Sequence, residues 1–383
     1  MKNEKMNPLT KCIHAGGYQD RVVGGVATPI YTSSSYRLDA EGGVVRYPRY
    51  FNIPTQTAVA EKAAALENGQ AGLVVSSGMA AVTTALVAFL KNGDHVLIQR
   101  DVYGGTYHFA AAQLERFGID YSLVDGGTAA DFAAMVRNNT RVLFFETPTN
   151  PLLKVVDIGA MAALARARGL ISIIDNTFAS PINQNPLDWG VDVVLHSGTK
   201  YLGGHGDLCC GVLVASNELM ASLRDVAINM GFVLAPQECY LLERSLKTLG
   251  LRVRQSNVNG QALSEFLSGH GRVRRVNYPG LPTHPGHEIA ARQMTGFGGM
   301  FSVEFDGDGA DALKIVNRLK LFSHAVSLGG VESLVCFPAL TSHAKLSSEE
   351  RKQVGISDSL LRFSAGAEDA EDLIADLRSA LEA

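Results

Sequence analysis

Two polar residues that follow neighbouring apolar segments could together hold a cofactor that forms a Schiff base. Asp175 ends the apolar segment 171–175, and Lys200 closely follows the next apolar segment, 193–196. Because the carboxyl ends of neighbouring parallel strands meet at the rim where open α/β sheets bind ligands, the carboxylate and the amine should lie close together. Pyridoxal 5'-phosphate (PLP) needs both, since a lysine holds it covalently and a carboxylate keeps its ring nitrogen protonated. We therefore predict that Asp175 and Lys200 bind PLP and that Lys200 is catalytic.

Each of these residues has a simpler explanation when it is taken alone. Asp175 could cap the N-terminus of a helix, and Lys200 could be an ordinary surface lysine. The hydroxyl groups of Ser197 and Thr199 beside Lys200 favour the cofactor, because a phosphate group also binds hydroxyls.

The segment around Lys200 resembles the pyridoxal-lysine signature of a known enzyme family. It reads Ser197-Gly198-Thr199-Lys200-Tyr201-Leu202-Gly203-Gly204-His205-Gly206-Asp207 and is similar to that of the Cys/Met-metabolism enzymes, the cystathionine gamma-synthase, beta-lyase and gamma-lyase family. The likeness continues in family order through segments 13–16, 278–281 and 361–366, nearly the whole chain. It implies PLP as cofactor and fold type I of PLP-dependent enzymes, an α/β fold with a large parallel-sheet (mixed) αβα domain and a smaller C-terminal α/β domain.

The resemblance also implies which other residues contact the cofactor. The turn 76–81 lies between a predicted strand and a predicted helix, where backbone N–H groups and the helix dipole favour an anion, although a plain turn is the alternative. The phosphate would be bound by Gly78, Met79, Ser197 and Thr199. Tyr103 would stack on the pyridine ring and assist proton transfer to the leaving group, and Asn150 would hydrogen-bond the ring hydroxyl.

A segment near the N-terminus implies that the active site is shared between subunits. Residues 47–55 resemble the family's Tyr-x-Arg-x-x-Asn-Pro-Thr element, with Ile53 inserted before the proline. In the family, the tyrosine and the arginine, here Tyr47 and Arg49, reach the phosphate of a neighbouring subunit, and the planar fork of arginine suits phosphate. We therefore expect a homo-oligomer, a tetramer built as two dimers.

Two residues near the C-terminus resemble the family's binding site for an amino-acid substrate. Arg362 would bind the substrate carboxylate, and Ser327 would supply a further contact. A buried arginine without an anion is costly, which favours this role; an ion pair with Glu332 or Glu368 is the alternative.

The reaction within the family is predicted from two positions. Gly105 stands where methionine gamma-lyases typically carry a cysteine, and Val326 replaces a glutamate often found in gamma-lyases and gamma-synthases. Both favour a cystathionine beta-lyase-like carbon–sulfur lyase, with cystathionine gamma-synthase or gamma-lyase as alternatives. Two other classes fit less well: a catalytically silent protein would most simply lack Lys200, and a nicotinamide oxidoreductase needs a G-x-G-x-x-G motif that segment 74–79 lacks.

Hydrophobic periodicity predicts the elements that position these residues. Apolar runs predict strands at 73–76, 95–98, 121–124, 142–146, 171–175, 193–196 and 211–215. Helices are expected at 79–90, 107–117 and 161–168, each ending near a glycine that can adopt the left-handed conformation, namely Gly93, Gly118 and Gly169. Further helices are expected at 238–249 and 258–267.

The chain divides into three predicted parts. Residues 1–55 form an extended arm, residues 56–250 the PLP-binding domain, and residues 251–383 the C-terminal domain. In the last part we expect strands at 300–305 and 360–364 and helices at 309–319 and 369–381.

Composition excludes several kinds of partner. The net charge of −4 across 383 residues, with no basic block, argues against nucleic acid. The start of the chain lacks the apolar stretch of a signal peptide and segment 80–90 is too short to span a bilayer, so we expect a cytoplasmic protein without membrane contact. The five cysteines form no C-x-x-C pair, so we expect reduced thiols and no metal site, and His95 is interpreted as structural.

Overall fold

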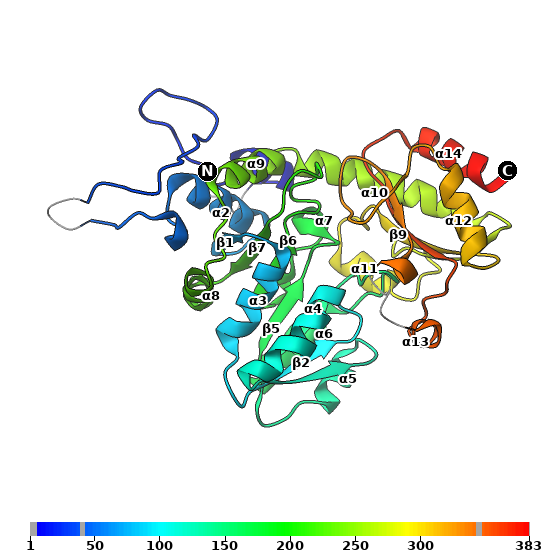
Figure 1. Ribbon diagram of the computed structural model, residues 1–383, viewed down its shortest axis with the longest axis horizontal. Coiled ribbons are helices and arrows are strands. Elements are labelled where there is room, and N and C mark those ends of the chain that lie inside the picture. Colours follow the sequence, from blue (N-terminus) through cyan, green and yellow to red (C-terminus); the bar gives the residue numbers. More distant parts are fainter. Residues whose placement is uncertain (1–5, 39–42, 342–346, 383) are drawn as a thin grey trace.

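A seven-stranded sheet forms the centre of the larger part of the chain (Figure 1). The computed structural model describes residues 6–38, 43–341 and 347–382. The strand order is β1-β7-β6-β5-β4-β2-β3, with all neighbours parallel except β7, which runs antiparallel to both β1 and β6. The strands are β1 (Ala71–Val75), β2 (His95–Gln99), β3 (Asp120–Val124), β4 (Thr140–Glu146), β5 (Ile171–Asp175), β6 (Val193–Ser197) and β7 (Gly211–Ala215). All seven predicted strands are present, and the mixed αβα arrangement is confirmed.

Both faces of this sheet are buried, which explains the continuous apolar runs in the sequence. Successive side chains of a strand point to opposite faces. On β5, Ile173 packs in a cluster with α3 (Gly78–Phe89) and α8 (Asn217–Met230), whereas Ile174 packs with α6 (Ile158–Arg168). The helices α2 (Pro54–Leu66) and α9 (Pro236–Leu246) cover the β1 and β7 end of the second face.

The predicted helices are present with changes at their ends. α6 begins at Ile158, where Asp157 caps it, and ends at Gly169 in the left-handed conformation, as predicted. α3 ends at Phe89 with Leu90 in extended backbone, so Gly93 lies in the following turn and does not cap the helix. Segment 107–117 is helical but irregular: α4 (Gly104–Phe109) continues into a π-type turn at 110–114 and a 3-10 turn at 115–117, and Gly118 ends it in the left-handed conformation.

The N-terminal arm is not extended throughout, because it contains one helix that the sequence did not predict. α1 (Pro8–His14) packs against α2 and α10 (Leu249–Ser268). The buried Lys62 ammonium on α2 donates to the carbonyls of Cys12 and Ile13, at the C-terminal end of α1. The described residues from 16 to 53 carry no regular element except a 3-10 turn at Pro48–Tyr50, and part of this segment projects away from the rest of the molecule (Figure 1).

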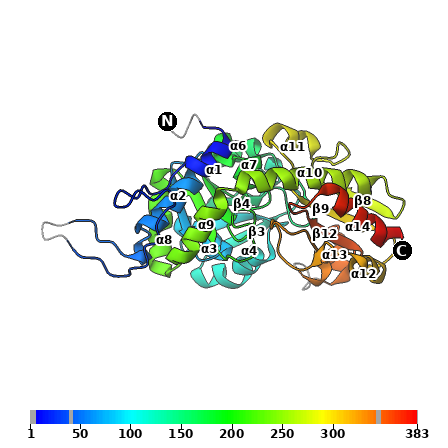
Figure 2. The ribbon, with the colours of Figure 1, turned by 90° about the horizontal axis from the view of Figure 1, so that it is seen from above.

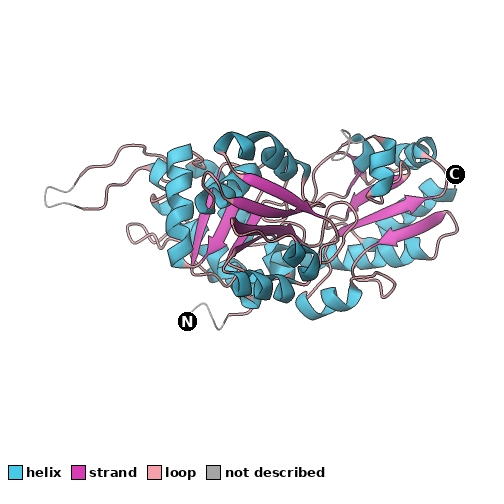
Figure 3. Ribbon diagram, turned by 90° about the horizontal axis from the view of Figure 1, so that it is seen from below, coloured by secondary structure: helices cyan, strands magenta, loops and turns pink. Residues whose placement is uncertain are grey.

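A second, five-stranded sheet forms the smaller part of the chain. Its order is β10-β11-β12-β9-β8, and it is reached through the long helix α10 (Leu249–Ser268), which extends from one part to the other (Figure 2). The strands are β8 (Val273–Asn277), β9 (Met300–Phe305), β10 (Ser323–His324), β11 (Leu334–Cys336) and β12 (Leu360–Ser364), so two predicted strands are confirmed with the same bounds. α10, α12 (Gly309–Arg318) and α14 (Ala370–Glu382) share one apolar cluster with this sheet. Figure 3 shows the two sheets as separate groups of strands.

The remaining helices are short. They are α5 (Ala129–Ala134), α7 (Ser180–Asn183), α11 (His287–Gln293) and α13 (Ser348–Gln353). The predicted helix 238–249 is split, since α9 ends at Leu246 and α10 begins at Leu249. Within the described ranges, no helix has the length and apolar character needed to cross a bilayer.

Candidate active site

Ten of the twelve predicted site residues line one cavity of about 670 Å³ at the carboxyl ends of the parallel strands. They are Gly78, Met79, Tyr103, Asn150, Asp175, Ser197, Thr199, Lys200, Ser327 and Arg362. The first eight come from the larger part of the chain, and the last two come from the smaller part. The cavity is therefore built where the two parts meet.

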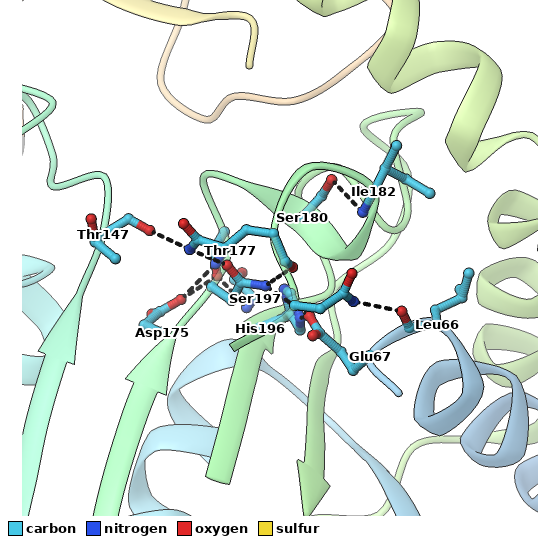
Figure 4. A network of polar contacts seen from close by, with 12 residues as sticks. Leu66, Glu67, Thr147, Asp175, Thr177, Ser180, Ile182, His196 and Ser197 are labelled. Atoms are coloured by element: carbon cyan, nitrogen blue, oxygen red, sulfur yellow. Dashed lines mark hydrogen bonds and ion pairs between the residues drawn. The ribbon is translucent and has the colours of Figure 1, made fainter. Parts of the chain in front are cut away.

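Asp175 is the last residue of β5 and is anchored to the end of β6. Its Oδ1 accepts hydrogen bonds from the backbone N–H of Thr177 (3.0 Å) and from the Thr177 hydroxyl (2.5 Å). The same hydroxyl accepts a hydrogen bond from the Ser197 backbone N–H at 2.8 Å (Figure 4). Burial raises the pKa of Asp175, and the bonds to Thr177 oppose that shift. A protonated ring nitrogen beside this carboxylate would stabilise its ionised form.

Lys200 lies just beyond β6, with its amine directed into the cavity. Its Nζ donates to the Ser327 hydroxyl at 2.8 Å, so the lysine spans from the larger part of the chain to the smaller. Burial lowers the pKa of Lys200, and the positive charge of Arg362 lowers it further. The amine therefore becomes neutral, and so nucleophilic, at a lower pH than an exposed lysine.

The predicted phosphate-binding residues surround the first turn of α3. Ser77 caps this helix by accepting a hydrogen bond from the Ala80 N–H at 3.0 Å. A Cβ atom at Gly78 would lie 2.9 Å from the Ser197 side chain, so only glycine lets the helix N-terminus come this close to β6. The Thr199 hydroxyl accepts from the Cys210 N–H at 3.1 Å, which fixes the loop before Lys200 against the start of β7. Backbone N–H groups and hydroxyls arranged in this way fit a phosphate group.

Glu146 is a cavity residue that our sequence reasoning missed. It is buried at the end of β4, where Oε2 accepts from the Tyr103 N–H at 2.9 Å and Oε1 from the Asn150 N–H at 3.1 Å. Burial, and then the nearby charge of Asp175, raise the pKa of Glu146 well above its usual value. One carboxyl group thus holds the two loops that carry Tyr103 and Asn150. Like Asp175, it ends an apolar strand, and that signal could have identified it.

Arg362 lies on β12 with its guanidinium group buried beside Ser327. Nη2 donates to the Ser327 carbonyl at 2.8 Å and Nη1 to the Asn150 side chain at 3.1 Å, while Nε is buried without a partner. Among the described residues, no carboxylate forms an ion pair with Arg362. The alternative of an ion pair with Glu332 or Glu368 is therefore wrong, and Glu368 instead accepts hydrogen bonds from Ser333. A buried cation without an anion fits a site for a carboxylate ligand.

Ser327 adopts a strained backbone conformation between the two cationic residues. Its φ angle is 87°, in a region that residues other than glycine rarely adopt. Its carbonyl accepts from Arg362 and its hydroxyl from Lys200, so this one residue contacts both.

Seven further cavity residues have no role predicted from the sequence. They are Val82, Pro148, Thr177, Phe178, Cys209, Leu340 and Thr341. Val326 and Leu340 are largely exposed, at 64% and 70%, and present apolar surface on the cavity side that the smaller part supplies.

Tyr47 and Arg49 do not line the cavity of their own chain. The guanidinium group of Arg49 lies 5.9 Å and 5.4 Å from the ring centres of Tyr47 and Tyr50 and donates to the Ile228 carbonyl at 3.1 Å. The inserted Ile53 is fully buried next to the start of α2. The role of these two residues in a neighbouring subunit stays a prediction.

A buried carboxylate at one strand end, a lysine beyond the next and a glycine-lined helix N-terminus, on a mixed αβα sheet, define the class of PLP-dependent enzymes of fold type I. Within that class, the chain belongs to the family of Cys/Met metabolism PLP-dependent enzymes, whose sequence profile matches residues 9–382. The predicted family, fold and cofactor are thereby confirmed.

Similar proteins catalyse more than one trans-sulfuration reaction. The chain is 45% identical over 381 residues to a cystathionine gamma-lyase from Bacillus subtilis, covering 98% of this chain and 100% of the relative. It is 44% identical over 376 residues to a cystathionine beta-lyase from Lactococcus lactis, covering 97% and 98%. The solved structure of a cystathionine gamma-lyase from Lactobacillus plantarum superposes with a TM-score of 0.94 at 41% identity, covering 98% and 99%. The protein is a PLP-dependent trans-sulfuration enzyme that acts on a small amino-acid substrate.

Proposed function

We propose that the protein is a cystathionine beta-lyase-like enzyme that breaks the bond between sulfur and the β-carbon of an amino-acid substrate. The observation that carries this proposal is the apolar Val326 at the cavity, where gamma-lyases and gamma-synthases often have a glutamate. Gly105 supports it as well, because a Cβ atom there would lie 2.5 Å from the Tyr103 ring and 2.9 Å from the Met79 sulfur. A cysteine at this position, as in methionine gamma-lyases, would displace Tyr103.

Ser327 places the groups needed for the first steps beside one another. Arg362 would bind the substrate carboxylate, and the amine of Lys200, which would hold the cofactor before substrate binds, would be released to act as a base. The released Lys200 amine then removes the proton from Cα, which is attached to the carboxylate that Arg362 holds. PLP, when bound, supplies an electron sink for the electron pair left at Cα.

The leaving sulfur needs a proton, and Tyr103 is the residue that we assign to this step. Its ring is half-exposed in the cavity, while Glu146 fixes its backbone. Asp175 would keep the ring nitrogen of the cofactor protonated, Asn150 would bind its ring hydroxyl, and its phosphate would be bound by Gly78, Met79, Ser197 and Thr199.

Product identification separates the proposal from its alternatives, cystathionine gamma-lyase and cystathionine gamma-synthase, which are also names of similar proteins. Purified holoenzyme is given L-cystathionine, and the keto acid is identified by chromatography. Pyruvate supports a beta-lyase. 2-Oxobutyrate would establish gamma-elimination. If cystathionine gives no keto acid but an activated homoserine and cysteine are joined to form cystathionine, with release of the activating acid, the enzyme is a synthase.

We also propose that the enzyme is a homotetramer built from two dimers and that Tyr47 and Arg49 serve the cofactor of a neighbouring subunit. The arm supports this proposal, because it leaves several apolar side chains exposed, namely Val22, Val23, Val26 and Leu38, as expected of a segment that packs on a second copy. Sedimentation equilibrium tests the assembly, and a monomeric active enzyme would contradict it. The five free thiols are in keeping with the reducing cytoplasm as its location.

A further inference from the structure

A buried polar network joins the ends of β4, β5 and β6 to the residue that follows α2 (Figure 4). At the ends of three adjacent strands, the residue next in sequence to a cavity residue belongs to this network. Thr147 follows Glu146, Asn176 follows Asp175, and His196 precedes Ser197. The network and the cavity therefore share the same three strand ends. They lie on opposite faces of the sheet, because successive residues of a strand point to opposite faces.

Glu67, just past the end of α2, is the centre of this network. Its side chain is almost fully buried, and its Oε1 lies 2.6 Å from Nε2 of His196. The same oxygen accepts a hydrogen bond from the Asn176 side chain at 2.8 Å. Its second oxygen, Oε2, is buried without a partner. Figure 4 shows Glu67 directed at His196 from outside the sheet.

Gln184 extends the network to the third strand end. Its Nε2 donates to the Asn176 side chain at 2.8 Å and to the Thr147 carbonyl at 3.1 Å. The Asn176 side chain donates in return to the Gln184 carbonyl at 2.9 Å. The ends of β4, β5 and β6 are thus joined by hydrogen bonds in addition to those of the sheet.

A buried carboxylate is expensive to desolvate, and apolar residues would fill the same space at lower cost. We propose that Glu67 is a positioning residue for the cofactor, which holds the ends of β6 and β5 through His196 and Asn176. The strand end at His196 carries Ser197 and the loop to Lys200, and the strand end at Asn176 carries Asp175. The inference depends on PLP binding and not on which carbon–sulfur bond is broken.

The test measures cofactor affinity in the absence of substrate. The cofactor is removed from wild-type, Glu67→Gln and His196→Gln holoenzyme, and each protein is titrated with PLP while its absorbance and fluorescence are followed. Each variant should bind PLP about 10- to 100-fold more weakly, which is the effect of losing one hydrogen bond to a charged group. The double variant should bind PLP as tightly as the single variant with the lower affinity, because both substitutions remove the same hydrogen bond between Glu67 and His196.

The matched control is His95→Gln at the opposite end of the sheet. His95 is also fully buried and hydrogen-bonds Thr140 (2.8 Å) and Ser122 (3.0 Å), but it lies at the start of β2, away from the cavity. This variant should lose thermal stability and keep its PLP dissociation constant within about twofold.

Two results would overturn the proposal. The first is unchanged PLP affinity in Glu67→Gln and His196→Gln, and the second is an equal loss of affinity in His95→Gln, which would indicate a general effect of core damage. If Glu67→Gln does not fold, His196→Gln decides alone. At saturating PLP, substrate KM should stay within about twofold in the network variants, because Arg362 and Ser327 belong to the other part of the chain. A rise in KM as large as the loss of PLP affinity would also contradict the assignment.

Discussion

Replacing Arg362 by methionine should remove most of the activity while leaving the fold as stable as before. The guanidinium group is buried, has no acidic partner among the described residues and keeps Nε free. A methionine fills a similar volume without a charge. The substitution therefore separates binding of the substrate carboxylate from stability.

The expected magnitude follows from the number of bonds that the arginine fork can form. Two hydrogen bonds to a carboxylate contribute about 1.5–3 kcal/mol each, or about 3–6 kcal/mol together. Since about 1.4 kcal/mol corresponds to a factor of ten, kcat/KM should fall by about 10² to 10⁴. Arg362→Lys keeps the charge but loses the fork, so it should lose about half of this free energy. The free energy of unfolding of cofactor-free Arg362→Met should stay within about 1 kcal/mol of wild type, because relief of the desolvation cost offsets the lost hydrogen bonds.

The assay compares an amino-acid substrate with its carboxamide, and the control is another buried arginine. Wild-type enzyme should strongly prefer the carboxylate, and Arg362→Met should not. Arg252 does not line the cavity, and it donates to the backbone carbonyls of Tyr201 (2.7 Å) and Ser245 (2.9 Å) and to the Thr248 hydroxyl (3.2 Å). Arg252→Met should therefore lower stability and leave the preference intact. A fall in kcat/KM of less than tenfold in Arg362→Met, or a retained preference for the carboxylate, would refute the reasoning.

Three further substitutions test other parts of the site. Lys200→Ala should retain PLP, visible in its spectrum, yet lose at least about 10³-fold in kcat because the base is absent, and normal turnover would remove Lys200 as the base. Arg49→Ala should release PLP about 10- to 100-fold more readily. Mixing its subunits with those of Lys200→Ala should restore about a quarter of the wild-type activity, because about half of all dimers then contain one subunit of each variant and each of these dimers has one of its two sites intact; no recovery would contradict a shared site. Glu146→Gln should flatten the pH dependence of stability of the cofactor-free protein: a carboxyl group whose pKa is raised on folding stabilises the fold below its unfolded pKa of about 4.3 and loses that contribution as pH rises through the folded pKa. Urea unfolding gives the free energy of unfolding at pH 5 and at pH 8. If this free energy changes equally between the two pH values in wild type and in Glu146→Gln, the burial argument is contradicted.

The central sheet could be predicted because its strands are apolar on both faces, so each forms a short continuous run between polar loops. The rim of the sheet that faces the ligand could be predicted as well, since Asp175 ends one such run and Lys200 closely follows another. α1 could not be predicted, because only Cys12 of its seven residues is buried and its position depends on Lys62 and on α10, which lie far away in sequence.

The residues that were missed depend on contacts between distant segments. Glu67 lies at a helix end between Leu66 and Asn68, where a charged residue normally faces solvent, and nothing local indicates that the sheet rim buries it. Glu146, in contrast, ends an apolar strand as Asp175 does, so this residue could have been identified from the sequence. The role predicted for Tyr47 and Arg49 would require a second subunit, whose position neither the sequence pattern nor a single chain provides.

The strand order determines how much of the chain must be synthesised before the phosphate-binding turn at the start of α3 can reach its final position. In the sheet, β1 lies at an edge and pairs with β7 alone among the described strands, although β7 is synthesised after all the others. The first turn of α3 follows β1 directly, so it has no fixed position relative to Ser197 until residue 215 has been made. Such pairing between distant segments forms slowly. More than half of the chain must therefore be translated before the turn that we expect to bind the cofactor phosphate can take its final position beside Ser197.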